Sequence, residues 1–78
     1  MDTNKYYGST EVMERVNISR MQLFYWELKG IITPTRITMG SRKFKRYSQM
    51  DIETLAELKK YLNQGYTLSS ASKRLKVQ

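Results

Sequence analysis

Cysteine and histidine are both absent from the 78 residues of this chain. Their absence excludes disulfides and thiol nucleophiles, and it removes the side chains that hold zinc in zinc fingers. The seven carboxylates are scattered along the chain, and none lies in a glycine-rich phosphate loop. We therefore expect no enzyme activity, no metal, no cofactor and no small-molecule ligand in this domain.

Long apolar runs are missing as well, since no stretch approaches the roughly 20 residues that a membrane span requires. The polar start at residues 1–5 does not resemble a signal peptide, so we expect a cytoplasmic protein with no membrane association. With 40% apolar residues, one proline and four glycines, the composition is typical of a folded protein. We expect a single domain over residues 1–78, with a flexible tail at residues 1–6.

Acidic residues are few, and one long segment has none. The chain has 14 lysines and arginines against seven acidic residues, which gives a net charge of +7 and a pI near 9.9. The segment from Lys29 to Arg46 holds six of these cations and no acidic residue. Such a concentration of positive charge favours a partner that carries phosphate groups, or an anionic membrane surface. Charge alone does not distinguish the two.

A short helix is indicated near the start of the chain. Ser9 or Thr10 can cap it, and Val12 and Val16 lie on its apolar side together with Met13. Only two or three residues separate this helix from the next cap, which predicts a tight helix-turn-helix rather than an open bundle.

The second helix has well-marked ends. Ser19 and Gln22 have the spacing of a capping box, and Gly30 supplies the left-handed residue that ends a helix. We expect Leu23 and Trp26 to face the core. The other face is also apolar, and we expect it to be exposed or to contact a partner; it comprises Met21, Phe24, Tyr25 and Leu28.

A basic β-hairpin is predicted after this helix. Residues 31–32 and 37–39 are short β-prone pieces, and a glycine turn separates them from a second strand at residues 43–47. Alternation along the second strand places Lys43 and Lys45 on one side, which we expect to face outward.

Two further helices complete the pattern. Ser48 and Asp51 can cap a third helix that ends near Gly65 and carries a regular apolar stripe. A last short helix is expected to turn Leu68, Ala71 and Leu75 inward and Lys73, Arg74 and Lys76 toward solvent. The predicted fold is mostly α with a small β-hairpin, a winged helix-turn-helix of about four helices.

Four segments, in order, resemble the DNA-binding domain of the MerR family of bacterial transcription regulators, a winged helix-turn-helix. They are residues 23–27 (LFYWE), residues 30–36 (GIITPTR), residues 44–52 (FKRYSQMDI) and residues 65–68 (GYTL). The resemblance covers roughly residues 7–75. It implies sequence-specific binding of double-stranded DNA in transcription regulation, and a location at the bacterial nucleoid.

Candidate DNA-binding residues follow from position and from this resemblance. The first turn of a recognition helix reads base edges, and wing cations contact phosphates. The resemblance adds an aromatic contact on the second helix and contacts in a second wing, while Glu27 is expected to have a structural role. The candidates are Ser19, Arg20, Met21, Gln22, Phe24, Tyr25, Arg36, Arg42, Lys43, Lys45, Arg46, Lys60 and Tyr66.

Departures from the family pattern leave two alternatives open. Phe24 stands where the family usually has a phosphate-binding arginine, and Lys45 replaces a wing arginine. The family continues into a dimerisation helix and an effector domain, whereas the 78 residues stop at Gln78, which fits either an excised domain or a complete protein. The resemblance implies a possible homodimer on DNA, and we expect these 78 residues to lack the helix by which the family dimerises. The alternatives are a small excisionase-like architectural DNA binder and a protein-binding adaptor that uses the exposed apolar helix face.

Overall fold

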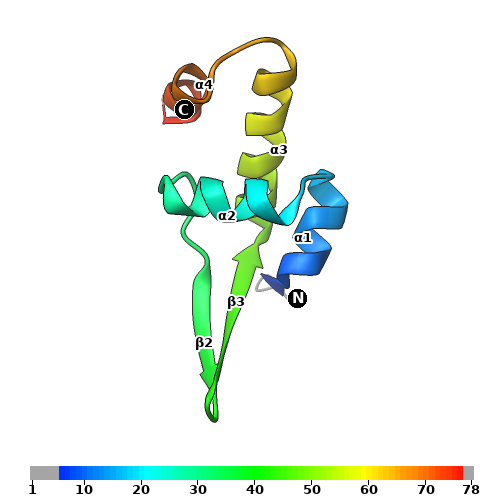
Figure 1. Ribbon diagram of the computed structural model, residues 1–78, viewed down its shortest axis with the longest axis vertical. Coiled ribbons are helices and arrows are strands. Elements are labelled where there is room, and N and C mark those ends of the chain that lie inside the picture. The colour runs from blue at the N-terminus through cyan, green and yellow to red at the C-terminus, as the bar shows by residue number, and fades with distance from the viewer. Residues whose placement is uncertain (1–5, 77–78) are drawn as a thin grey trace.

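The structure, a computed structural model, describes residues 6–76, so residues 1–5 of the tail expected at residues 1–6 lie outside the described residues. The elements in chain order are β1 (Tyr6–Tyr7), α1 (Ser9–Val16), α2 (Arg20–Leu28), β2 (Thr35–Met39), β3 (Arg42–Ser48), α3 (Gln49–Asn63) and α4 (Leu68–Lys76) (Figure 1). Four helices and a small antiparallel sheet confirm the predicted winged helix-turn-helix.

The helix-turn-helix is formed by α1 and α2, and the cap of α2 is as predicted. The Ser19 hydroxyl accepts from the Gln22 amide at 3.1 Å, and the Gln22 side chain accepts from the Ser19 amide at 2.9 Å. The cap expected for α1 at Ser9 or Thr10 is wrong by at least one residue, because Gly8 is the N-cap and makes no side-chain bond. The Ser9 hydroxyl instead bonds to the Tyr47 side chain.

Helix α2 ends in a Schellman motif. Gly30, at φ +80°, donates to the Glu27 carbonyl, and the Ile31 amide donates to the Trp26 carbonyl at 3.1 Å. This motif corrects the expectation of a β-piece at residues 31–32. Ile31 belongs to the helix end, and Ile32 is buried in the core.

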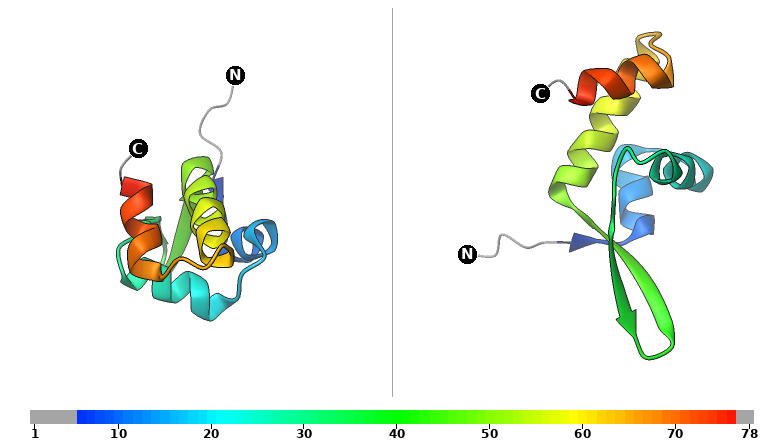
Figure 2. Two further views of the ribbon diagram at one scale, coloured as in Figure 1. Left: turned by 90° about the horizontal axis from the view of Figure 1, so that it is seen from above. Right: turned by 90° about the vertical axis from the view of Figure 1, so that its left-hand side faces the viewer.

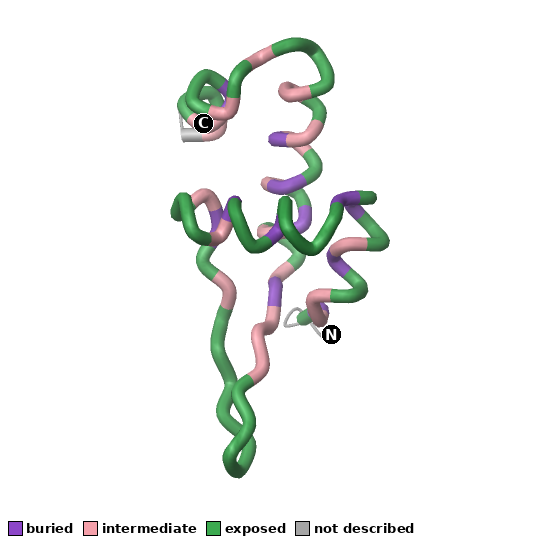
Figure 3. Tube along the Cα trace, in the orientation of Figure 1, coloured by how far each residue is buried: buried purple, intermediate pink, exposed green. Residues whose placement is uncertain are grey.

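The sheet has the strand order β1-β3-β2, with antiparallel pairing throughout. Strands β2 and β3 form the wing, in which Ile37 faces Phe44 and the turn contains Gly40 at φ +64°. The hairpin extends away from the helices and is largely exposed (Figures 2 and 3). Tyr6 pairs with Ser48, so this residue is part of a strand rather than of the expected tail.

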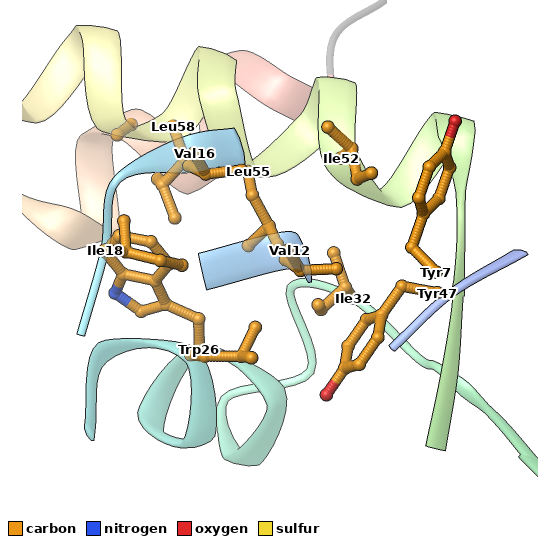
Figure 4. Close-up of a cluster of buried hydrophobic side chains, with 12 residues drawn as sticks. Tyr7, Val12, Val16, Ile18, Trp26, Ile32, Tyr47, Ile52, Leu55 and Leu58 are labelled. Atoms are coloured by element: carbon orange, nitrogen blue, oxygen red, sulfur yellow. The ribbon is translucent and has the colours of Figure 1, made fainter. Parts of the chain in front are cut away.

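The core lies where α1, α2 and α3 meet the base of the wing (Figure 4). Leu23 and Trp26 of α2 are both buried, as their helical spacing predicts. The capping box at Ser48 and Asp51 is present, and α3 then carries the buried stripe. The core residues are Tyr7, Val12, Val16, Ile18, Leu23, Trp26, Ile32, Tyr47, Ile52, Leu55, Leu58 and Ala71.

One lysine fastens α1 to α3. The Lys59 ammonium donates to the carbonyl of Val16 at 3.2 Å and also to that of Asn17, at the carboxyl end of α1. A cation at this position satisfies carbonyls that have no partner within the helix, and it complements the negative end of the helix dipole. Lys59 therefore has a structural role.

Candidate nucleic-acid interface

The outward face of α2 is exposed and apolar, as predicted. Met21 is 81% exposed, Leu28 71% and Phe24 57%, and Tyr25 lies beside them. Solvent-exposed apolar side chains scattered singly are ordinary, but four on one face of a nine-residue helix form a contiguous surface. We call these four residues the apolar face of α2.

Polar groups at the start of α2 are mostly engaged. The Oε1 atom of Gln22 and the Ser19 hydroxyl are both used in the capping box. A bidentate bond from Gln22 to adenine would need that amide oxygen, so it would have to compete with the cap. Arg20 is exposed and has no ion-pair partner within the described residues.

Glu27 joins α2 to the wing. Its Oε1 accepts from the Lys45 ammonium at 2.9 Å, and its Oε2 accepts from the Tyr47 hydroxyl. The structural role expected for Glu27 is therefore confirmed. The outward orientation expected for Lys45 is wrong, because its side of β3 faces α2 and brings the ammonium onto this carboxylate.

The Tyr47 hydroxyl in this linkage has a raised pKa. Its side chain is 1% exposed, and its pKa is raised from 10.0 to about 12, first by burial and then by the hydrogen bond to Glu27. A hydrogen bond with Ser9 opposes this shift. The hydroxyl therefore stays protonated and donates to the Glu27 carboxylate over the physiological range.

A groove of about 310 Å³ lies between α2 and β3. Arg20 and Phe24 line it from α2, and Lys45 and Tyr47 line it from the wing. The Lys45 ammonium lies 5.6 Å from the centre of the Phe24 ring, within cation–π range. The groove therefore joins the apolar face of α2 directly to the wing.

The wing separates its cations onto two sides. Paired residues of antiparallel strands share a face, so Arg36, Lys43 and Lys45 lie on the side that meets α2, since Arg36 pairs with Lys45 and Tyr47 contacts Glu27. Arg42 and Arg46 lie on the opposite side. Their guanidinium carbons are 5.7 Å and 5.6 Å from the centre of the Phe44 ring.

A cluster of two tyrosines and an arginine lies between α3 and α4. The rings of Tyr61 and Tyr66 pack edge to face with their centres 5.5 Å apart. The Arg74 guanidinium carbon lies 4.4 Å from the centre of the Tyr66 ring. The sequence placed Arg74 on a solvated face, and its stacking on Tyr66 was not foreseen. Lys60 is exposed and lies with Arg15 in a separate shallow groove, so the structure does not bring it to Tyr66.

A further groove continues the apolar face of α2 toward α4. Tyr25, Lys29 and Ile31 line it on one side, and Leu68 and Ser72 line it on the other. The Lys29 ammonium lies 5.3 Å from the centre of the Tyr25 ring. The wing, α2 and the α3–α4 region thus share a continuous surface.

Acidic residues are segregated from this surface. Among the described residues, α2, the wing and α4 contain one acidic residue, Glu27, which is paired with Lys45. The other described acidic residues are on α1 and α3: Glu11, Glu14, Asp51, Glu53 and Glu57. The exposed part of the α2 and wing surface therefore carries positive charge.

No helix within residues 6–76 is long and apolar enough to span a membrane. The same residues contain no group of three or more acidic side chains placed to hold a metal ion. The surface over α2 and the wing presents cations and exposed aromatic rings.

A helix-turn-helix with an adjacent basic hairpin defines a winged helix-turn-helix protein. The MerR HTH family of regulatory proteins matches residues 7–78, and the chain belongs to this family. It is a regulatory, DNA-binding family and not an enzymatic one. The chain therefore has the DNA-binding, regulatory function of this family. No curated protein matches the chain.

Proposed function

We propose that this domain binds double-stranded DNA in a sequence-specific manner, as the DNA-reading part of a transcription regulator. The observation that carries the proposal is that the exposed face of α2, which begins with Arg20, adjoins the basic inner side of the wing, and that this surface has no unpaired acidic residue among the described residues. Phosphate binding releases condensed counterions, and this favours such a surface.

Each part of the surface has a distinct task in this proposal. Helix α2 enters the major groove, which is wide enough for a helix, and its first turn approaches the base edges with Arg20. The wing cations Arg36 and Lys43 contact the phosphate backbone beside it. Lys45 has a different role, since its bond to Glu27 fixes the angle between α2 and the wing.

The region between α3 and α4 supplies a further backbone contact. The Arg74 guanidinium stacks on Tyr66, and a stacked guanidinium keeps its N–H edges free for a phosphate. Tyr66 is half-buried against Tyr61, which holds its ring in place. We assign Arg74 and Tyr66 jointly to phosphate binding, and Lys60 to a separate contact.

The test is a fluorescence-anisotropy titration of the chain with a random duplex pool, followed by selection and sequencing of the bound duplexes. The proposal requires salt-sensitive binding and enrichment of one motif. Salt-sensitive binding without enrichment would instead support an architectural DNA binder. Absence of binding at about 50 mM salt, where phosphate contacts are strong, would contradict DNA binding altogether.

A further inference from the structure

We propose that this recognition helix reads thymine methyl groups, through Met21 and Phe24, as its main source of base discrimination. The inference rests on the proposed function and specifies the chemistry that the α2 surface recognises. Few polar groups of α2 are free to read bases.

Hydrogen-bond readout by α2 is limited by its own structure. The amide oxygen of Gln22 accepts from the Ser19 amide in the capping box, and Glu27 is paired with Lys45 and Tyr47. Arg20 remains as the charged donor in the first turn, and that turn contains no acidic side chain to accept from cytosine. Hydrogen bonds from α2 therefore read few bases.

Helix α2 has exposed apolar side chains that can contact apolar groups on bases. Met21 and Phe24 lie in the first two turns of α2, the part of a recognition helix that approaches base edges, and they are 81% and 57% exposed. In the major groove the one apolar group on a base edge is the C5 methyl of thymine. Contact with this methyl removes exposed apolar surface from water on both sides.

The charges around the two aromatic rings favour DNA over a protein as the occupant. Lys45 lies over the Phe24 ring and Lys29 over the Tyr25 ring, so an ammonium group stands beside each ring of this face. The core of a protein interface is usually depleted of such charges. A major groove, in contrast, places apolar methyl groups between two rows of phosphates.

The experiment compares thymine with uracil, which lacks only the methyl group. Duplexes selected from the random pool are resynthesised with one thymine at a time replaced by uracil, and the affinity is measured by anisotropy. We expect about fourfold weaker binding at one or two positions, the equivalent of one buried methyl group. The variants Phe24→Ala and Met21→Ala should each lose the thymine preference at one of these positions.

Leu28→Ala is the matched control, because Leu28 belongs to the same apolar face but lies in the last turn, away from the bases. This variant should keep the full preference for thymine. All three side chains are exposed, so circular dichroism and thermal unfolding should match the wild type.

The outcomes separate the two proposals. An enriched motif that binds equally with thymine and uracil would overturn the methyl readout alone. Binding without enrichment, or no binding, would overturn both, and the second result would point to a protein partner for the apolar face of α2.

Discussion

Glu27 orients the recognition helix relative to the wing. Its two carboxylate oxygens accept from Lys45 and Tyr47, which are two residues apart on the same side of β3. Because β3 continues into α3 through the Ser48 cap, this one carboxylate links α2 to the sheet and to the core helix. The angle between α2 and the wing, which the DNA would meet, depends on these bonds.

Replacement of Tyr47 by phenylalanine should reveal the Glu27 linkage as a pH effect. The variant loses a hydrogen bond to a carboxylate, so we expect its free energy of unfolding to fall by about 1–2 kcal/mol near neutral pH. The folded-state pKa of Tyr47 is raised from 10.0 to about 12, so its contribution is complete below pH 10 and is lost as the pH rises toward 12. Phenylalanine cannot ionise.

The wild type should therefore lose about 2 kcal/mol relative to the Tyr47→Phe variant between those two pH values. Denaturant unfolding at a series of pH values measures the difference, in which all other titrating groups cancel. Parallel stability curves would contradict the buried Tyr47–Glu27 bond.

Arg74 should matter for DNA binding through its position as well as its charge. We expect Arg74→Ala to weaken binding of a selected duplex about fivefold, which corresponds to about 1 kcal/mol for a charged contact. Arg74→Lys keeps the charge but lacks the planar group that stacks on Tyr66, so it should restore only part of the affinity. Lys73→Ala removes the neighbouring exposed charge and is the control. Equal losses for Arg74→Ala and Lys73→Ala, measured by anisotropy, would show a general charge effect.

At the scale of elements, the wing is a two-sided hairpin whose cations have different surroundings. Lys43 lies on the side that meets α2, and Arg46 lies on the opposite side against Phe44. Lys43→Ala should weaken DNA binding and reduce the slope of log affinity against log salt by about 0.9, the value for one phosphate contact.

Arg46→Ala removes the same charge from the same strand and should leave that slope close to the wild-type value. Thermal unfolding of both variants must accompany the titrations, because Arg46 is partly buried. If Arg46→Ala changes the slope as much as Lys43→Ala does, the two sides of the wing are not distinct in binding.

The two ends of α2 and the start of α3 were the most predictable features, whereas the cap of α1 was not. The Ser19–Gln22 and Ser48–Asp51 caps and the exit at Gly30 depend on residues within one turn of each other, so the sequence alone specifies them. The buried positions Leu23 and Trp26 followed from helical spacing for the same reason. Local signals therefore predicted the position of α2 and α3 and which side of α2 is buried.

Features that depend on how elements meet were not predictable. Alternation along β3 grouped Lys43 with Lys45, but the side of the strand that meets α2 is decided by tertiary packing, so Lys45 was expected to face outward. The stacking of Arg74 on Tyr66 depends in the same way on the angle between α3 and α4. The site residues of the first turn of α2 remain predictions, and Gln22 carries a constraint from its cap that spacing alone did not reveal.

At the scale of the whole molecule, charge is divided between two regions. Described acidic residues other than the paired Glu27 are on α1 and α3, while the wing carries five cations and α2 begins with Arg20. Four to six phosphate contacts should give a slope of log affinity against log salt of roughly −4 to −5. The variant Glu14→Gln raises the net charge on α1, to which the proposal assigns no DNA contact, so it should keep the same slope. A marked change with Glu14→Gln would indicate that binding responds to net charge rather than to the surface.

Chemical-shift mapping of backbone amides during titration with a selected duplex tests the proposed interface most directly. We expect the largest changes in the first turns of α2, on the inner side of the wing around Arg36 and Lys43, and around Tyr66 and Arg74. Amides near Glu14 on α1 should change little. Changes centred on α1 and the outer side of the wing, with α2 unaffected, would contradict the proposal that α2 reads the DNA.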